Sequence, residues 1–203
     1  MAAAKPMSGI ARQAPNVLSG ARIAAVPVLL ALAAAGQERL FTWVLIPALL
    51  TDIADGLIAR ICSLESRLGA ALDSIADSLL LFAAVYGIWC FHQEVIRQYP
   101  LLCGLAVGLW LLENLLALWR YRRLSSFHTY ASKAAANLLG LFVAVLFVFG
   151  LQPWLLYAAT GVSILSSLEE LALVALLREW RADVRGLWWV LRARARRVAG
   201  QPR

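Results

Sequence analysis

The chain has 203 residues, of which 62% are hydrophobic and 15% are charged, and its mean hydropathy is +0.73. This composition is too apolar for a soluble domain of that length and predicts an integral membrane protein. The net charge of +7 does not indicate nucleic-acid binding, because most basic residues flank apolar segments, where we expect them to meet anionic lipid headgroups.

The chain begins with a weakly apolar segment, residues 1–14, which contains Lys5 and Arg12. Its composition is compatible with a short helix on the membrane surface and equally with disorder. The apolar run that follows could pass for a signal peptide, but the basic region before it is long, and removing the run would leave an odd number of spans. We therefore predict that this run is the first transmembrane helix.

Six apolar segments follow one another, and each approaches or exceeds the length with which a helix crosses a hydrocarbon core of about 30 Å. We expect transmembrane helices over residues 17–35, 41–61, 68–91, 101–119, 132–149 and 154–177. The last two are separated only by residues 150–153, whose Gly and Pro predict a tight hairpin. Because no repeat and no linker interrupts the pattern, the sequence predicts a single all-α, polytopic membrane domain over residues 1–203.

Basic residues are distributed unevenly between the two sides of such a bundle. Apart from Arg39 and Arg97, every Lys and Arg lies near the N-terminus, in turns on one side, or after Leu177. This asymmetry predicts that both termini are cytoplasmic. The tail, residues 178–203, alternates Arg with Trp and Leu, which predicts a basic helix lying on anionic lipid.

Four aspartates lie in residues 51–78, within or beside two of the predicted spans. They are Asp52, Asp55, Asp73 and Asp77. Each unpaired acid would cost about 2.5 to 3.5 kcal/mol near the centre of a membrane helix. Positive charge is therefore expected close to them.

The first half of this stretch forms one stripe of a helix. At about 100° per residue, the positions that align are Asp52, Asp55, Gly56 and Ala59, with Arg60 at the edge. Gly56 and Ala59 are compatible with ordinary helix packing as well as with a bound ligand.

The second half also places a small residue and two aspartates on one helix face, because Gly69, Asp73 and Asp77 follow at i, i+4 and i+8. If the chain turns near Leu64, Asp55 lies as far before the turn as Asp73 lies after it. Asp52 then nearly matches Asp77, so that four carboxylates face one another at one depth. Oxygen ligands from facing helices suit hard divalent cations, and we expect Mg²⁺ or Mn²⁺, with two ions in the site.

An ion-pair network and a cation transporter account for the aspartates less well. An ion-pair network with Arg60 and Arg67 would neutralise too few of the four acids. A divalent-cation transporter would place acids within reach of both faces and break its helices at mid-membrane. Here the acids cluster near one side, and we expect no Gly or Pro interruption at mid-membrane in either helix.

The complete pattern, from Asp52 to Asp77, reads D-x2-D-G-x2-A-R-x8-G-x3-D-x3-D. It resembles the signature of the CDP-alcohol phosphatidyltransferase family at every fixed position. The resemblance implies a membrane enzyme that moves a phosphatidyl group from CDP-diacylglycerol to an alcohol and releases CMP. It also implies a homodimer. The uneven distribution of basic residues places the aspartate hairpin on the cytoplasmic side, and we expect a bacterial inner-membrane protein whose active site faces the cytoplasm.

The resemblance further implies a role for each motif residue. Asp52, Asp55, Asp73 and Asp77 would bind the metal ions, and Asp77 would also be the general base. The residues expected at the nucleotide are Asp52, Asp55, Gly56, Ala59, Arg60, Gly69 and Asp73.

The acceptor alcohol is less well indicated than the reaction. The context Pro15-Asn16-x-Leu18-Ser19-x2-Arg22 is similar to the start of the phosphatidylglycerophosphate synthase branch and of inositol-lipid synthases. We expect glycerol 3-phosphate, with inositol phosphate or another alcohol as alternatives. The candidate acceptor-binding residues are Arg22, Arg120, His128 and Lys133. Arg22 is also compatible with a side chain that extends to the membrane surface.

Other polar residues carry less information. The three cysteines, Cys62, Cys90 and Cys103, have no metal-binding spacing, and we interpret them as reduced. Glu113, Glu169 and Glu170 are further acids in predicted spans, for which a structural and a functional role are equally compatible.

Overall fold

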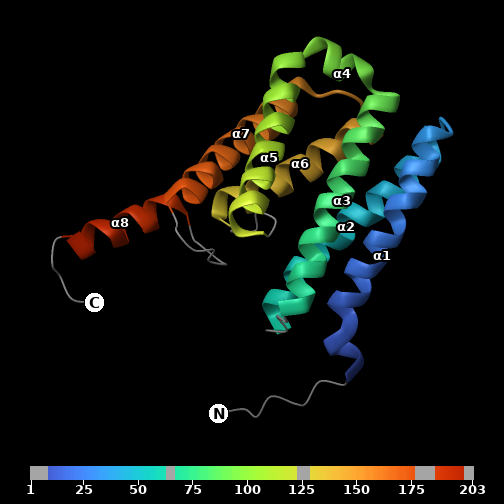
Figure 1. The fold of residues 1–203 in the computed structure, drawn as a ribbon. Helices are drawn as coiled ribbons and strands as arrows, with labels where there is room; N and C mark the ends of the chain where they lie inside the picture. Colours follow the sequence, from blue (N-terminus) through green and yellow to red (C-terminus); the bar gives the residue numbers. More distant parts are fainter. Residues whose placement is uncertain (1–8, 63–66, 123–128, 177–185, 199–203) are drawn as a thin grey trace. The chain divides into compact units, whose positions relative to one another are not determined.

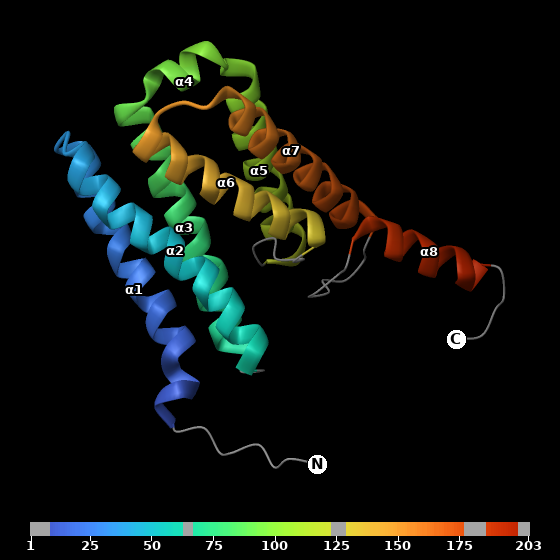
Figure 2. The same ribbon diagram turned by 180° about the vertical axis from the view of Figure 1, so that it is seen from behind.

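The computed structural model describes residues 9–62, 67–122, 129–176 and 186–198, with side chains described over 18–51, 75–122, 129–176 and 186–192. Throughout these residues the regular secondary structure is helical and includes no strand, as Figures 1 and 2 show. The all-α prediction is therefore confirmed for this part of the chain. The helices form two compact units, Met1–Ile96 and Arg97–Arg203.

The first unit contains three long helices: α1 (Gly9–Ala34), α2 (Glu38–Cys62) and α3 (Arg67–Phe91). Helix α1 packs against both α2 and α3, and α2 also contacts α3 (Figure 1). The bounds of α2 and α3 agree with the predicted spans to within three residues. The turn predicted near Leu64 lies outside the described residues.

One feature of this unit differs from the sequence prediction, and another agrees with it. Helix α1 begins at Gly9, so part of the segment 1–14 is continuous with the first predicted span. Pro47 lies inside α2, within the predicted span 41–61, and does not interrupt the helix. The helix continues through Pro47, because packing against α1 and α3 can maintain a helix that lacks one backbone donor.

Small residues let the three helices approach closely. On α3 the buried face consists of Ala76, Leu80, Ala83, Ala84 and Gly87, at spacings that align on one side of a helix. A side chain at Gly87 would come within 2.3 Å of the Phe41 ring on α2. Such small residues at helix contacts are typical of membrane bundles.

A short helix that the sequence did not predict, α4 (Gln93–Gln98), follows α3. Its residue Val95 is buried, and the preceding His92 contacts Glu94 at 3.1 Å and Glu38 at 3.4 Å. The segment between the third and fourth predicted spans is thus structured rather than a simple loop.

The second unit contains α5 (Pro100–Tyr121), α6 (Tyr130–Phe149), α7 (Pro153–Leu176) and α8 (Leu187–Val198). Helix α7 is central, because it packs against α5, α6 and the start of α8. The predicted hairpin between α6 and α7 is confirmed: Gly150 ends α6 with φ +82°, and its N–H donates to the Leu146 carbonyl. At the other end of α6, the Thr129 side chain accepts a hydrogen bond from Ser132 N–H as an N-cap.

Three helices in the described part of the chain are long and apolar enough to cross a membrane, namely α5, α6 and α7. Shorter apolar stretches of α1 and α3 cover Leu18–Ala34 and Ile75–Phe91. These helices indicate an integral membrane protein. The six spans and the cytoplasmic placement of both termini stay predictions.

Candidate active site

Two helices of the first unit carry the aspartate motif. Asp52 and Asp55 lie on α2, and Asp73 and Asp77 lie on α3, which α2 contacts. The motif residues Gly56, Ala59, Arg60 and Gly69 lie on the same two helices. Among these residues only Asp77 lies within the range in which side chains are described. The backbone therefore brings both halves of the motif into one helix pair, as the hairpin prediction requires.

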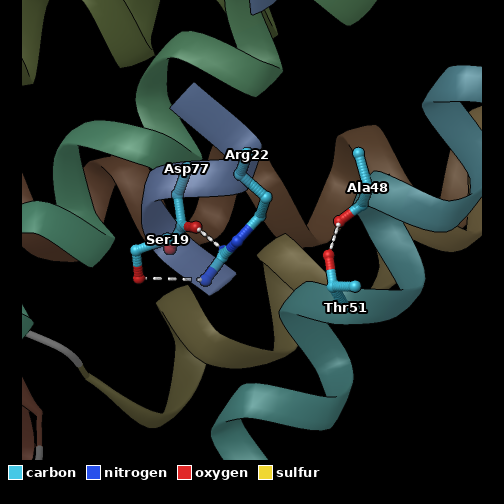
Figure 3. A network of polar contacts seen from close by, with 5 residues as sticks. All are labelled: Ser19, Arg22, Ala48, Thr51 and Asp77. Carbon is cyan, nitrogen blue, oxygen red and sulfur yellow. Dashed lines mark hydrogen bonds and ion pairs between the residues drawn. The ribbon is translucent and has the colours of Figure 1, made fainter. Parts of the chain in front are cut away.

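Asp77 is held by an arginine from the third helix of the unit. The Arg22 guanidinium donates from Nη1 to Asp77 Oδ1 at 2.6 Å and from Nη2 to Ser19 Oγ at 3.5 Å, as Figure 3 shows. The Arg22 side chain is 1% exposed and that of Asp77 is 46% exposed. Arg22 is thus a buried partner of the motif, and the alternative that it extends to the membrane surface is wrong.

The local sequence explains why Arg22 points inward. Among the described side chains of α1, from Leu18 onward, the buried ones are Ser19, Arg22, Val26, Leu29 and Ala33, which align on one helix face. Arg22 occupies a core position of this face, so its charge must be neutralised by the helices that α1 contacts. Asp77 on α3 does this, so Arg22 is a cation placed next to one of the four motif aspartates.

The donor set fits a divalent cation. The motif supplies four carboxylates from two contacting helices, and Asp77 is half-exposed, so that its carboxylate is not sealed within the core. Carboxylate oxygens are the ligands that Mg²⁺ and Mn²⁺ prefer. Within the described side chains there is no group of three or more His, Cys, Asp or Glu residues, and Asp52, Asp55 and Asp73 lie outside that range. The match between this site and a divalent cation is therefore argued from the carboxylate chemistry of the four residues and from their placement on α2 and α3.

The other acceptor-binding candidates lie in the second unit or outside the described residues. Arg120 is in the last turn of α5, where its guanidinium carbon is 5.8 Å from the centre of the Tyr121 ring. Lys133 is exposed in the first turn of α6. His128 lies outside the described residues. Arg22 is the acceptor-binding candidate that shares a unit with the aspartates.

The structure also places the three glutamates. Glu113 on α5 is buried, forms a side-chain hydrogen bond with Ser167, and lies near the carboxylate of Glu170 on α7, which is also buried. Glu169 instead accepts a hydrogen bond from Leu187 N–H at the start of α8. Cys90 and Cys103 are free thiols.

Sequence reasoning missed the role of Ser19 and the pairing of Arg22 with Asp77. The signal was present, because Ser19 and Arg22 are three residues apart on the apolar stripe of α1. Thr51, which directly precedes the first aspartate, was also passed over. Its hydroxyl donates to the Ala48 carbonyl at 2.8 Å on α2 (Figure 3).

The fold and the site together define an all-helical membrane protein with acidic residues on a contacting helix pair. Comparison with known families gives a match to the CDP-alcohol phosphatidyltransferase model over residues 12–165. The chain belongs to this family. The matched range includes the whole aspartate motif and Arg22.

Curated relatives are similar over shorter ranges. A putative cardiolipin synthase of Mycobacterium tuberculosis is 32% identical over 47% of this chain and 50% of its own length. A CDP-diacylglycerol--glycerol-3-phosphate 3-phosphatidyltransferase of Rickettsia bellii is 35% identical over 45% of this chain and 51% of its own. A similarly named protein of Arabidopsis thaliana is 40% identical over 35% of this chain and 32% of its own length. The matches thus span about half, or less, of these relatives. No solved structure matches the chain.

Proposed function

We propose that this chain transfers a phosphatidyl group from CDP-diacylglycerol to an alcohol and releases CMP, with glycerol 3-phosphate as the acceptor. The observation that carries the proposal is the family motif on α2 and α3, whose last aspartate, Asp77, is held by the buried Arg22. The names of the Rickettsia and Arabidopsis relatives favour glycerol 3-phosphate over inositol phosphate.

In this proposal Asp52, Asp55, Asp73 and Asp77 hold two Mg²⁺ or Mn²⁺ ions. When bound, the ions supply positive charge that neutralises the pyrophosphate of the nucleotide and the phosphate of the leaving CMP. Gly56, Ala59 and Gly69 lack bulky side chains, so they leave room for the cytidine and ribose against the helix backbone. Arg60 contacts a phosphate of the nucleotide.

Asp77 acts as the general base. Its carboxylate accepts the proton of the acceptor hydroxyl as the hydroxyl oxygen forms a bond to the β-phosphorus of CDP-diacylglycerol. The bond from that phosphorus to the bridging oxygen breaks, and CMP leaves with the electron pair. Arg22 fixes one carboxylate oxygen at 2.6 Å and is therefore a positioning residue for the base.

Arg22 also supplies charge for acceptor choice. A guanidinium beside the base can pair with the phosphate of glycerol 3-phosphate while the acceptor hydroxyl approaches Asp77. Arg120, His128 and Lys133 are further acceptor-binding candidates from the sequence. The mycobacterial relative is named a putative cardiolipin synthase, so a lipid alcohol is a second acceptor class to be tested.

We further propose that the enzyme is a homodimer in a bacterial inner membrane, with its active site open to the cytoplasm. The placement follows from the basic residues on one side of the predicted bundle. It suits the reaction, because one substrate is a lipid and the other dissolves in water.

The test is a transfer assay with the purified full chain, CDP-diacylglycerol and either Mg²⁺ or Mn²⁺. Glycerol 3-phosphate, inositol phosphate and phosphatidylglycerol are offered separately, and CMP and the lipid product are both measured. We expect CMP release with glycerol 3-phosphate, loss of activity with EDTA, and recovery when the metal is restored.

The controls separate the competing functions. The Arg39→Gln variant removes an exposed α2 cation outside the motif and should retain activity. CMP release with another acceptor alone would change the substrate but keep the reaction. Absence of CMP with every acceptor, together with uptake of Mn²⁺ into proteoliposomes, would instead establish a transporter.

A further inference from the structure

The first turn of α8 is seated on the second unit rather than free in solution. Leu187 and Val190, three residues apart on α8, pack against the buried cluster formed by Ala117, Leu173 and Val174. These cluster residues come from α5 and α7. The start of α8 is therefore part of the core of this unit.

The carboxylate of Glu169 holds the start of α8 in this position. Leu187 N–H, the first of α8, donates to Glu169 Oε1 on α7 at 2.8 Å. The first N–H groups of a helix have no partner within the helix, and the helix dipole favours a negative charge there. Glu169 thus satisfies one such donor and stabilises the N-terminus of α8 electrostatically.

Gly186 makes the close approach possible. Its φ is +152°, and a side chain there would come within 2.9 Å of Glu169 Oε1 and 3.3 Å of the Trp189 ring. Glycine tolerates this backbone conformation and leaves room for the carboxylate. Gly186 and Glu169 together therefore allow the start of α8 to lie close to α7.

Aromatic rings gather at the same end of the unit. The Tyr121 hydroxyl at the end of α5 donates to the Val174 carbonyl near the end of α7 at 3.2 Å. Tyr130, the first residue of α6, has its ring centre 6.0 Å from that of Trp189. Trp188 and Trp189 are 57% and 44% exposed, although Leu187 and Val190 of the same helical turn are partly buried. Exposed tryptophan and tyrosine at one end of membrane-crossing helices are typical of a membrane interface.

The rest of α8 is strongly basic. It contains Arg192, Arg194, Arg196 and Arg197 and no acidic residue. The Arg192 guanidinium carbon lies 4.9 Å from the centre of the Trp188 ring, so that an exposed cation and an exposed apolar ring share one surface. This combination is complementary to a negatively charged lipid headgroup above an apolar acyl region.

We propose that α8 is a docked lipid-binding helix, held by Glu169 and Gly186, whose tryptophans enter the bilayer interface and whose arginines bind anionic phospholipid headgroups. The charge of α8 and its continuity with the aromatic end of α5 and α6 select a bilayer as the partner. Because the first turn of α8 is already packed against α5 and α7, lipid binding does not have to order it. The inference does not depend on the proposed reaction.

The test is hydrogen exchange by mass spectrometry on the full chain in nanodiscs of phosphatidylcholine alone or mixed with phosphatidylglycerol. We expect exchange of the backbone amides of residues 187–198 to slow by at least about fivefold in the anionic bilayer, which is the effect of one arginine near a charged surface. Exchange over α6 should be unchanged. High salt should abolish the difference.

Variants identify the groups responsible. Replacing the four α8 arginines by glutamine should remove the dependence on anionic lipid, whereas the matched change Arg39→Gln with Arg97→Gln should keep it. Glu169→Ala should speed exchange at the first turn of α8 in both bilayers. Equal exchange of the unaltered chain in both bilayers would overturn the proposal. So would slowing that persists in the arginine variant, or that appears only in nanodiscs holding two copies of the chain.

Discussion

The two compact units accommodate acidic side chains in different ways. In the first unit Asp77 is paired with the buried cation Arg22 at 2.6 Å and is itself half-exposed. In the second unit Glu113 is 6% exposed, hydrogen-bonded with Ser167, and near a second buried acid, Glu170. An acid that is fixed by a cation and open on one side can take part in chemistry, whereas an enclosed acid among hydroxyl groups is better suited to helix packing.

The hydroxyl groups of the second unit lie along one helix. Thr160, Ser163, Ser166 and Ser167 of α7 are all buried. Two of them are already satisfied by their own helix, because Thr160 donates to the Leu156 carbonyl and Ser163 to the Ala159 carbonyl. We therefore expect substitutions of Asp77 to change activity, and substitutions of Glu113 or of the buried α7 hydroxyl groups to change mainly stability.

The largest expected effect is that of Asp77→Asn. The amide keeps the shape of the side chain but cannot accept the acceptor's proton, so CMP release should fall by about 10² to 10⁴-fold. The transfer assay measures it, with Arg39→Gln as the control. Activity within a few-fold of the unaltered protein would remove Asp77 from the role of general base.

Arg22→Gln should destabilise the first unit. Removing one partner of a buried ion pair costs about 3 to 5 kcal/mol, and we expect the lower end of this range because Asp77 is half-exposed. Thermal unfolding in detergent micelles measures the change. Adding Asp77→Asn to this variant should recover part of the stability but none of the activity, because the two side chains interact directly. Strict additivity of the two changes would contradict the pairing.

Gly87→Ala in the first unit and Gly104→Ala in the second compare helix packing in the two units by adding a single methyl group to each. The new methyl group would meet the Phe41 ring, which is fully buried and whose centre lies 5.5 Å from that of the tilted Phe91 ring. We expect a loss of about 1 to 3 kcal/mol in the free energy of unfolding. Gly104→Ala on α5, where no atom lies within 4 Å of the added carbon, is the matched control and should stay within about 0.5 kcal/mol. Equal effects at both sites would contradict the close α2–α3 packing.

Glu113→Gln should have the smallest effect. The amide oxygen can still accept the Ser167 hydrogen bond, and one of two neighbouring acids is removed. Stability should be unchanged or raised by up to about 1 kcal/mol, and CMP release should be unaltered. A large loss of CMP release from this variant would show that the second unit also contributes to the chemistry.

Much of the helical fold could be predicted from the sequence. All six predicted spans have a helix at their position, because long apolar runs in a membrane protein must satisfy their backbone groups within the helix. The start of α1 at Gly9 and the short helix α4 were not predicted, whereas the uninterrupted helix through Pro47 was. Each depends on contacts with neighbouring helices, which outweigh the local preferences of proline or of a polar segment.

The candidate site, like the fold, has features that the sequence predicts and others that only the packed helices reveal. The sequence by itself determined the family and the aspartate positions on α2 and α3, because fixed spacing along a helix is a property of the chain alone. Only the tertiary structure decided that Arg22 pairs with Asp77, that Glu113 meets Ser167, and that Glu169 caps α8. These partners are 55, 54 and 18 residues apart in the chain, so they meet only where helices pack, and no local pattern encodes that approach.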